Sequence, residues 1–262
     1  VDQLRRERRF VFAVLQPNPV MVAPLASLLK SLLDGGKVRR VGIAHVDDTF
    51  GNAMMGELSA RLQKALVPVT IVQRYPLGAP DLSAVVKALV RAEVDAFVGA
   101  SYPPDSMLLT SQSSALRFNP RLYYTAVGTA FPSFRDAFHG AEGVMGVAGW
   151  NPKVKHAGAA EYFAAHKAMH GREPDRWASA FVYASLQILE TCVATAGLDR
   201  PKIKELLDTQ EFQTIAGPIR FIAGVNSTTP GMIGQWQKGE FELVAPASQA
   251  TGKLVFPKPP WA

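Results

Sequence analysis

The chain has one cysteine, no internal repeat, no low-complexity tract and no run of about 18 uninterrupted apolar residues. A lone Cys192 excludes an intrachain disulfide framework, and its place in an apolar helical run predicts a small core residue. The lack of a long apolar run predicts no transmembrane helix. The chain starts at Val1 without an apolar signal segment, so we expect its natural start to have been removed.

Residues with charge of the same sign cluster only near the N-terminus of the chain. The 28 basic residues are scattered among 22 acidic ones, for a net charge of +6. The one basic cluster consists of Arg5, Arg6, Arg8 and Arg9, with acidic residues beside it. Because nucleic-acid binding needs a basic stripe or patch, this distribution favours a solvated surface instead. The 48% hydrophobic and 19% charged content is typical of a globular chain.

Short apolar runs of strand length alternate with longer amphipathic runs from Phe10 onward. The predicted strands are Phe10–Gln16, Val41–Val46, Val69–Tyr75, Ala96–Ala100, Leu122–Val127 and Val144–Ala148. Helical runs separate them; Asp81 is the expected N-cap of one, and Pro103–Asp105 opens another. Such serial strand–helix units predict an α/β fold with a parallel sheet that helices cover on both faces.

The pattern changes after Trp150. Helices are predicted at Ala159–His170, Ser179–Ala196 and Pro201–Leu207, with no strand-like run between them. Strands follow at 219–222, 232–237 and 241–245, the last two as a hairpin. The three helices therefore have no sheet of their own in this pattern, although their apolar stripes must be buried against something.

Catalytic and metal-binding signatures each fail at a residue that the chemistry needs. Gly51–Gly56 has the outer glycines of a phosphate loop, but Glu57 and Leu58 replace the lysine and the hydroxyl residue. His166 and His170 lie one helical turn apart, yet no glutamate lies between them and Lys167 opposes a cation, so a solvated helix face is favoured. We therefore expect no metal site, no cofactor and no enzyme activity.

Asp47 and Asp48 leave an alternative open. They follow a predicted strand, where paired carboxylates can bind Mg²⁺ or act as acid and base. Against this, Asp48 followed by Thr49 is a common start of a helix. The loops at the carboxyl ends of the strands are otherwise rich in aromatic and hydroxyl residues, which favours binding without chemistry.

Several segments together resemble the type I periplasmic solute-binding proteins of ABC transporters, the Leu/Ile/Val-binding (branched-chain amino acid) family. The segments are Val41–Gly51, Tyr75–Ser83, Val94–Val98, Ala141–Val144, Trp150–Pro152, Gly217–Phe221, Gln235–Gly239 and Pro257–Trp261. The resemblance implies two doubly wound parallel-sheet lobes that close by a hinge motion. It also implies that the N-terminal part of the first lobe is absent from this chain.

The resemblance divides the chain into four parts. Residues 1–16 are a crossover remnant of the first lobe, 17–149 the second lobe, 150–231 the helical part of the first lobe, and 232–262 a return to the second lobe with the tail. The helices over residues 159–207 would then cover strands that this sequence does not contain. We expect this region to associate, swap with another chain or lose order unless the missing part or a second chain covers it.

The implied function is that of an extracytoplasmic (periplasmic) receptor that captures a small organic molecule between two lobes and delivers it to the permease subunits of an ABC importer. The implied ligand-binding residues are Asp48, Phe50, Ser101, Tyr102, Gly128, Thr129, Phe131 and Trp150. Amino-acid-binding members pair the ligand's ammonium with a glutamate in the loop that here reads Val127–Ala130, without a carboxylate. The ligand class therefore stays open among an amino acid, an aromatic or other carboxylate, and an amide. A ligand-sensing regulatory module of the same fold is the alternative.

Overall fold

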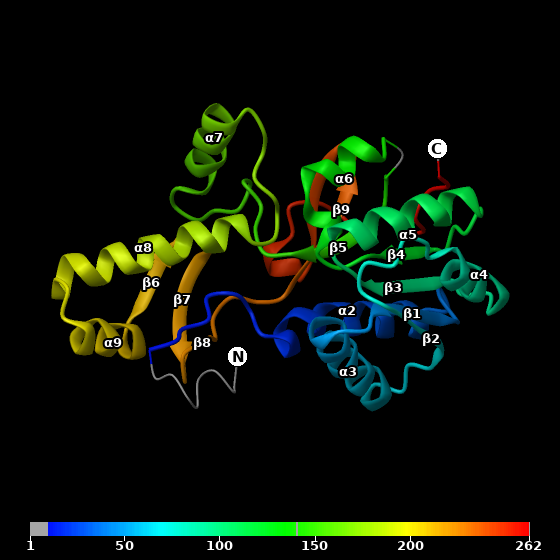
Figure 1. Ribbon diagram of the computed structural model, residues 1–262, viewed down its shortest axis with the longest axis horizontal. Helices are drawn as coiled ribbons and strands as arrows, with labels where there is room; N and C mark the ends of the chain where they lie inside the picture. Colours follow the sequence, from blue (N-terminus) through cyan, green and yellow to red (C-terminus); the bar gives the residue numbers. More distant parts are fainter. Residues whose placement is uncertain (1–9, 140, 262) are drawn as a thin grey trace. The chain divides into compact units, whose positions relative to one another are not determined.

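The computed structural model describes residues 10–139 and 141–261, which form two compact units (Figure 1). Unit 1 consists of residues 10–17 and 149–230, and unit 2 of residues 18–148 and 231–261. The arginine cluster at residues 5, 6, 8 and 9 lies outside the described residues. We describe each unit by itself.

Unit 2 is built on a seven-stranded sheet with the order β10-β9-β5-β4-β3-β1-β2. The strands are β1 Val41–Val46, β2 Val69–Tyr75, β3 Ala96–Ala100, β4 Leu122–Tyr124, β5 Met145–Ala148, β9 Met232–Gln237 and β10 Glu240–Ala245. Strands β2, β1, β3, β4 and β5 pair in parallel. Strand β9 is antiparallel to β5 and forms the predicted hairpin with β10.

Helices cover both faces of this sheet. They are α2 Asn18–Asp34, α3 Thr49–Lys64, α4 Ser83–Arg91, α5 Pro103–Ala115 and α6 Pro132–Ala137, with a 3₁₀ turn η1 at Gly128–Ala130 and another, η2, at Ala247–Gln249. Figure 1 shows α2 and α3 on one face of the sheet and α4 and α5 on the other. The central strands β1 and β3 are buried along their whole length, whereas the edge strand β2 alternates in exposure. Continuous apolar strands are what a sheet covered on both faces requires.

The order of the strands creates a switch point between β1 and β3. After β1 the chain passes through α3 to β2, on one side; after β3 it passes through α5 to β4, on the opposite side. The loops at the carboxyl ends of β1 and β3 therefore diverge. In open α/β sheets a crevice at such a point is the usual place for a ligand.

Unit 1 contains three helices and a small antiparallel sheet. The helices are α7 Ala159–His170, α8 Ser179–Ala196 and α9 Arg200–Thr209, and the sheet has the order β6-β7-β8 with β6 Glu211–Thr214, β7 Gly217–Ile222 and β8 Val225–Asn226. One core packs α8 against this sheet through Phe181, Ala184, Ile188, Cys192, Phe212, Ala216, Ile219 and Phe221. Cys192 is buried there, as the sequence predicts.

Two predictions for unit 1 were wrong. Helices α8 and α9 do have a sheet to cover. The sequence pattern did not predict two of its strands, because β6 has one apolar residue, Phe212, and β8 consists of only two residues. The predicted strand Phe10–Gln16 forms a single bridge, between Ala13 and Val225. Ala13 N–H donates to the Gly224 carbonyl at 2.8 Å, and the short β8 offers little further backbone with which to pair.

Two local predictions for unit 2 also need correction. Helix α4 has Leu82 at its N-cap rather than Asp81. Asp81 lies one residue earlier and accepts from the Ser83 amide at 2.9 Å, and this hydrogen bond lowers the pKa of the Asp81 carboxyl. Strand β4 ends at Tyr124 and not at Val127, because the chain turns away towards η1 after Thr125.

Helix α8 is long and apolar enough, by length and composition, to cross a membrane. One of its faces nevertheless forms the core of unit 1 through Phe181, Ile188 and Cys192. A neighbouring side of the helix exposes Val182, Leu186 and, less fully, Leu189. This core packing is that of a helix in a globular unit.

Candidate functional site at the carboxyl edge of the unit 2 sheet

Asp48 and Tyr102 meet across the switch point between β1 and β3. The Tyr102 hydroxyl donates to Asp48 Oδ2 at 2.9 Å, and the Gly51 amide donates to Asp48 Oδ1 at 2.8 Å. Asp48 is thus the N-cap of α3, and Tyr102 that of α5. Because each residue begins a helix that runs down a different face of the sheet, their contact joins the two diverging loops.

Phe50 adds an aromatic surface to this contact. Its ring centre lies 5.0 Å from that of Tyr102, with an angle of 36° between the planes. Both side chains are half-buried, so part of each ring remains accessible to solvent. Burial raises the pKa of the Tyr102 hydroxyl, and the neighbouring Asp48 raises it further. The phenol therefore stays protonated at neutral pH and acts as a hydrogen-bond donor.

Other predicted site residues are buried and hold the loops together. Ser101 Oγ lies 2.8 Å from Ser106 Oγ, and both hydroxyls donate to the Thr125 carbonyl. Thr129 Oγ1 lies 2.5 Å from Thr125 Oγ1. These hydroxyl groups fix the turn after β4 against the start of α5, which makes Ser101 and Thr129 supports of the loop edge.

Gly128 occupies a place with no room for a side chain. A Cβ atom there would lie 2.6 Å from Ser106 Cβ and 2.8 Å from Pro103 Cα. Such distances are not tolerated without a shift of the backbone. The close packing of this loop on α5 leaves no space for a larger side chain at position 128.

Asp105 and Tyr75 belong to the same edge, and the sequence analysis did not single them out as site residues. The Asp105 carboxylate is buried and accepts from the Tyr102 amide at 3.3 Å, and burial raises the pKa of this carboxyl. Burial also strongly raises the pKa of Tyr75, whose hydroxyl lies 3.5 Å from the Ala100 carbonyl. The Pro103–Asp105 segment could have indicated that Asp105 lies at this edge of the sheet. The sequence analysis interpreted it only as the start of a helix.

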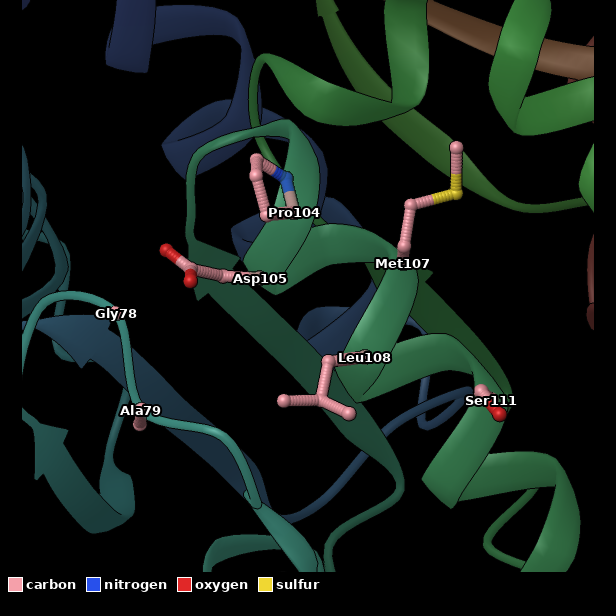
Figure 2. A pocket seen from close by; sticks show the side chains of 7 residues that line it. All are labelled: Gly78, Ala79, Pro104, Asp105, Met107, Leu108 and Ser111. Carbon is pink, nitrogen blue, oxygen red and sulfur yellow. The ribbon is translucent and has the colours of Figure 1, made fainter.

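A shallow pocket of about 470 Å³ lies beside this cluster (Figure 2). Gly78, Ala79, Pro104, Asp105, Met107, Leu108 and Ser111 line it. Figure 2 shows the Asp105 carboxylate on the side of α5 that faces the loop with Gly78 and Ala79. Since Asp105 also binds the Tyr102 amide, the pocket adjoins the pair formed by Asp48 and Tyr102.

The two remaining predicted residues, Phe131 and Trp150, belong to different units. Phe131 is half-buried at the start of α6 in unit 2. Trp150 belongs to unit 1, where it is 1% exposed and packs edge-on against Tyr162 at 5.5 Å. Within the described part of the chain its indole N–H has no hydrogen-bond partner.

The carboxylates at this edge already accept hydrogen bonds from backbone amides and from neighbouring side chains. Asp47 Oδ1 accepts from Asn52 Nδ2 at 3.0 Å, and both oxygens of Asp48 have donors. Across residues 10–139 and 141–261, no three histidine, cysteine, aspartate or glutamate side chains gather into a metal-binding group. The edge therefore offers two aromatic rings and one phenol to a ligand, which is the chemistry of binding.

A doubly wound sheet with an aromatic and hydroxyl-rich switch point defines a ligand-binding α/β protein. Comparison with known families then gives the particular family. The chain belongs to the periplasmic binding protein family, whose model matches residues 11–240. The family is one of solute-binding receptors. The predicted family and fold are thereby confirmed.

Individual relatives agree with this assignment. The chain is 26% identical over 237 residues to Leu/Ile/Val-binding protein homolog 8 of Brucella abortus, which covers 85% of this chain and 58% of the relative. The chain thus spans a little over half the length of that curated relative. Its fold is similar to LivJ of Streptococcus pneumoniae in complex with isoleucine, with a TM-score of 0.77, 16% identity and coverage of 94% of this chain and 70% of the other.

A second solved structure has a different ligand. It is an ABC transporter solute-binding protein from R. palustris in complex with benzoate, with a TM-score of 0.79, 13% identity and coverage of 93% and 67%. At such identities the likeness is one of fold.

Proposed function

We propose that the chain is the solute-recognition part of an extracytoplasmic receptor that binds a small organic molecule and delivers it to the permease subunits of an ABC importer. Membership of the periplasmic binding protein family supports the receptor class. The contact between Asp48 and Tyr102, with Phe50 stacked beside it, supports the position of the ligand site at the switch point of unit 2. That units 1 and 2 act as two lobes around the ligand is part of this proposal.

The chemistry of the edge suggests the ligand class. The rings of Phe50 and Tyr102 suit the apolar part of a ligand. The loop over Val127–Ala130 offers no carboxylate to pair with an ammonium. Aromatic and short carboxylic acids and amides are therefore preferred over α-amino acids.

A ligand panel tests the proposal directly on the 262-residue chain. Benzoate, benzamide and isoleucine are added separately, and binding is measured by thermal shift and by ligand-observed NMR. A ligand present at 100 times its dissociation constant is expected to raise the free energy of unfolding by about 2.7 kcal/mol. No response to any of the three classes would count against a receptor function.

Two variants locate the site. Tyr102→Ala and Phe50→Ala remove the rings and are expected to weaken binding by about tenfold each. Val90→Ala, on the outer side of α4 and 43% exposed, is the control and is expected to leave binding unchanged. Equal affinity for all three variants would place the ligand elsewhere.

Two alternatives have their own tests. A ligand-sensing regulatory module of the same fold predicts a regulated operon around the gene, whereas a receptor predicts neighbouring permease and ATPase genes. An enzyme based on Asp47 and Asp48 predicts a turnover that Asp47→Asn and Asp48→Asn abolish. The structural roles of both carboxylates, as partner of Asn52 and as cap of α3, speak against that enzyme.

A further inference from the structure

Helix α7 ends with two histidines whose rings lie against each other. His166 and His170 are four residues apart, so both side chains project from one face of the helix. Their ring centres are 4.6 Å apart, with an angle of 53° between the planes. His170 is exposed and His166 half-buried at the surface of unit 1. A hydrated ion can therefore reach both rings.

The hydrogen bond of His166 defines which nitrogen is available. Its Nδ1 atom lies 3.0 Å from the carbonyl oxygen of Arg172. Because a carbonyl oxygen only accepts, Nδ1 carries the proton and the lone pair is on Nε2. In metal sites, a histidine that binds the ion through one ring nitrogen commonly donates a hydrogen bond from the other to a backbone carbonyl, which orients the ring.

The separation of the two rings fits a shared ion. A metal about 2.1 Å from each Nε2 would hold the ring centres roughly 4.5 to 5.2 Å apart, for nitrogen–metal–nitrogen angles between about 90° and 109°. The observed 4.6 Å lies within this range.

The positive charge near the two histidines does not prevent a cation from binding. Lys167 lies between the histidines in sequence, but its ammonium is 4.0 Å from Glu173 Oε1, which offsets part of its charge. No third histidine, cysteine, aspartate or glutamate joins the pair within the described residues. Water must therefore complete the coordination shell.

We propose that His166 and His170 form a two-histidine surface site for a borderline divalent transition metal ion such as Ni²⁺, Cu²⁺ or Zn²⁺. Two imidazoles select these ions over Mg²⁺ and Ca²⁺, which prefer oxygen ligands. A bound ion would clip the last turns of α7 together. Neither histidine is among the residues assigned to the proposed solute site.

The test is a titration of the chain, prepared without an affinity tag, with Ni²⁺ alone, followed by calorimetry. One ion per chain is expected, with no response to Mg²⁺. His166→Asn and His170→Asn should each lower the affinity by about tenfold or more. His139→Asn, which removes another exposed histidine, is the matched control and should change nothing.

A second measurement guards against a folding defect in the variants. Ni²⁺ should raise the melting temperature of the parent chain, and chelation by EDTA should reverse the rise; both effects should be absent from the double variant of His166 and His170. Paramagnetic broadening should fall on the ring protons of these two histidines before those of His139. Binding that persists unchanged in the double variant, or no binding at millimolar Ni²⁺, would overturn the proposal.

Discussion

Gly128 packs so closely on Ser106 that a Cβ atom on the glycine would lie 2.6 Å from the Cβ atom of the serine. The Ser106 hydroxyl in turn donates to the Thr125 carbonyl at 3.0 Å. The loop after β4 is therefore locked onto the start of α5 by both packing and hydrogen bonding. This contact sets the shape of the candidate site without contributing an exposed functional group.

Gly128→Ala should lower the free energy of unfolding by about 2 kcal/mol or more, because the new methyl group overlaps Ser106 and Pro103. Chemical denaturation measures the change. Gly56→Ala is the matched control: nothing lies within 4 Å of its would-be Cβ, and the residue is inside α3. That variant should stabilise the chain by about 0.5 to 1 kcal/mol, since alanine favours a helix over glycine. Equal effects of the two substitutions would contradict the packing described for Gly128.

The hydrogen bond between Tyr102 and Asp48 should couple the two loops energetically. Tyr102→Phe removes the donor and keeps the ring against Phe50, so we expect a loss of about 1 kcal/mol. A double-mutant cycle with Asp48→Ala, measured by urea denaturation, isolates the pair, because the lost cap of α3 contributes equally to the single and the double variant. The expected coupling energy is about 0.5 to 1.5 kcal/mol. A coupling of zero would show that the contact does not hold the loops together.

Lys258 should make stability depend on pH in the alkaline range. Its side chain is buried, with the ammonium over the Trp261 ring at 3.5 Å and donating to the Pro259 carbonyl at 2.6 Å. Burial lowers the pKa of Lys258 from its usual 10.5 to about 8. Below pH 8 the amine is charged in both the folded and the unfolded chain, so the full cost of burying the charge is present.

Between pH 8 and 10.5 the folded chain loses this proton before the unfolded chain does, so the free energy of unfolding should rise with pH. Lys258→Met should remove that rise and should gain roughly 2 kcal/mol at pH 7 relative to the parent. Urea denaturation at several pH values measures both effects. Lys253→Met, at an exposed position of the same tail, should keep the pH profile of the parent.

The exposed face of α8 should promote self-association. Val182, Leu186 and Leu189 are 62%, 60% and 48% exposed and lie on one side of the helix, next to the side that carries the core residues Ile188 and Cys192. Light scattering of the parent chain should show association that grows with concentration, because such an apolar stripe favours burial. Leu186→Lys combined with Leu189→Lys should restore a monomer.

The control for that experiment is Leu198→Lys, which changes a residue that is 86% exposed beyond the end of α8. It should leave the association unchanged. A monomeric parent chain with cooperative unfolding would refute the prediction for α8.

The sequence by itself determined the elements whose signal is local. Strands Val41–Val46 and Ala96–Ala100 and helices Ala159–His170 and Ser179–Ala196 have the predicted bounds, because buried strands need continuous apolar runs and helices need an apolar stripe. The parallel order of the unit 2 strands followed from the same alternation of runs. The family resemblance came from the motifs along these elements, and the predicted ligand residues stay predictions.

The tertiary structure decided what depends on residues far apart in the chain. Strand β6 exists because β7 offers it a partner, while Phe10–Gln16 forms one bridge because β8 is too short to offer more. The contact between Tyr102 and Asp48 joins residues 54 positions apart. The burial of Trp150 likewise follows from packing against α7. Periodicity in a sequence reports which face of an element is buried, but only the assembled chain determines what lies against that face.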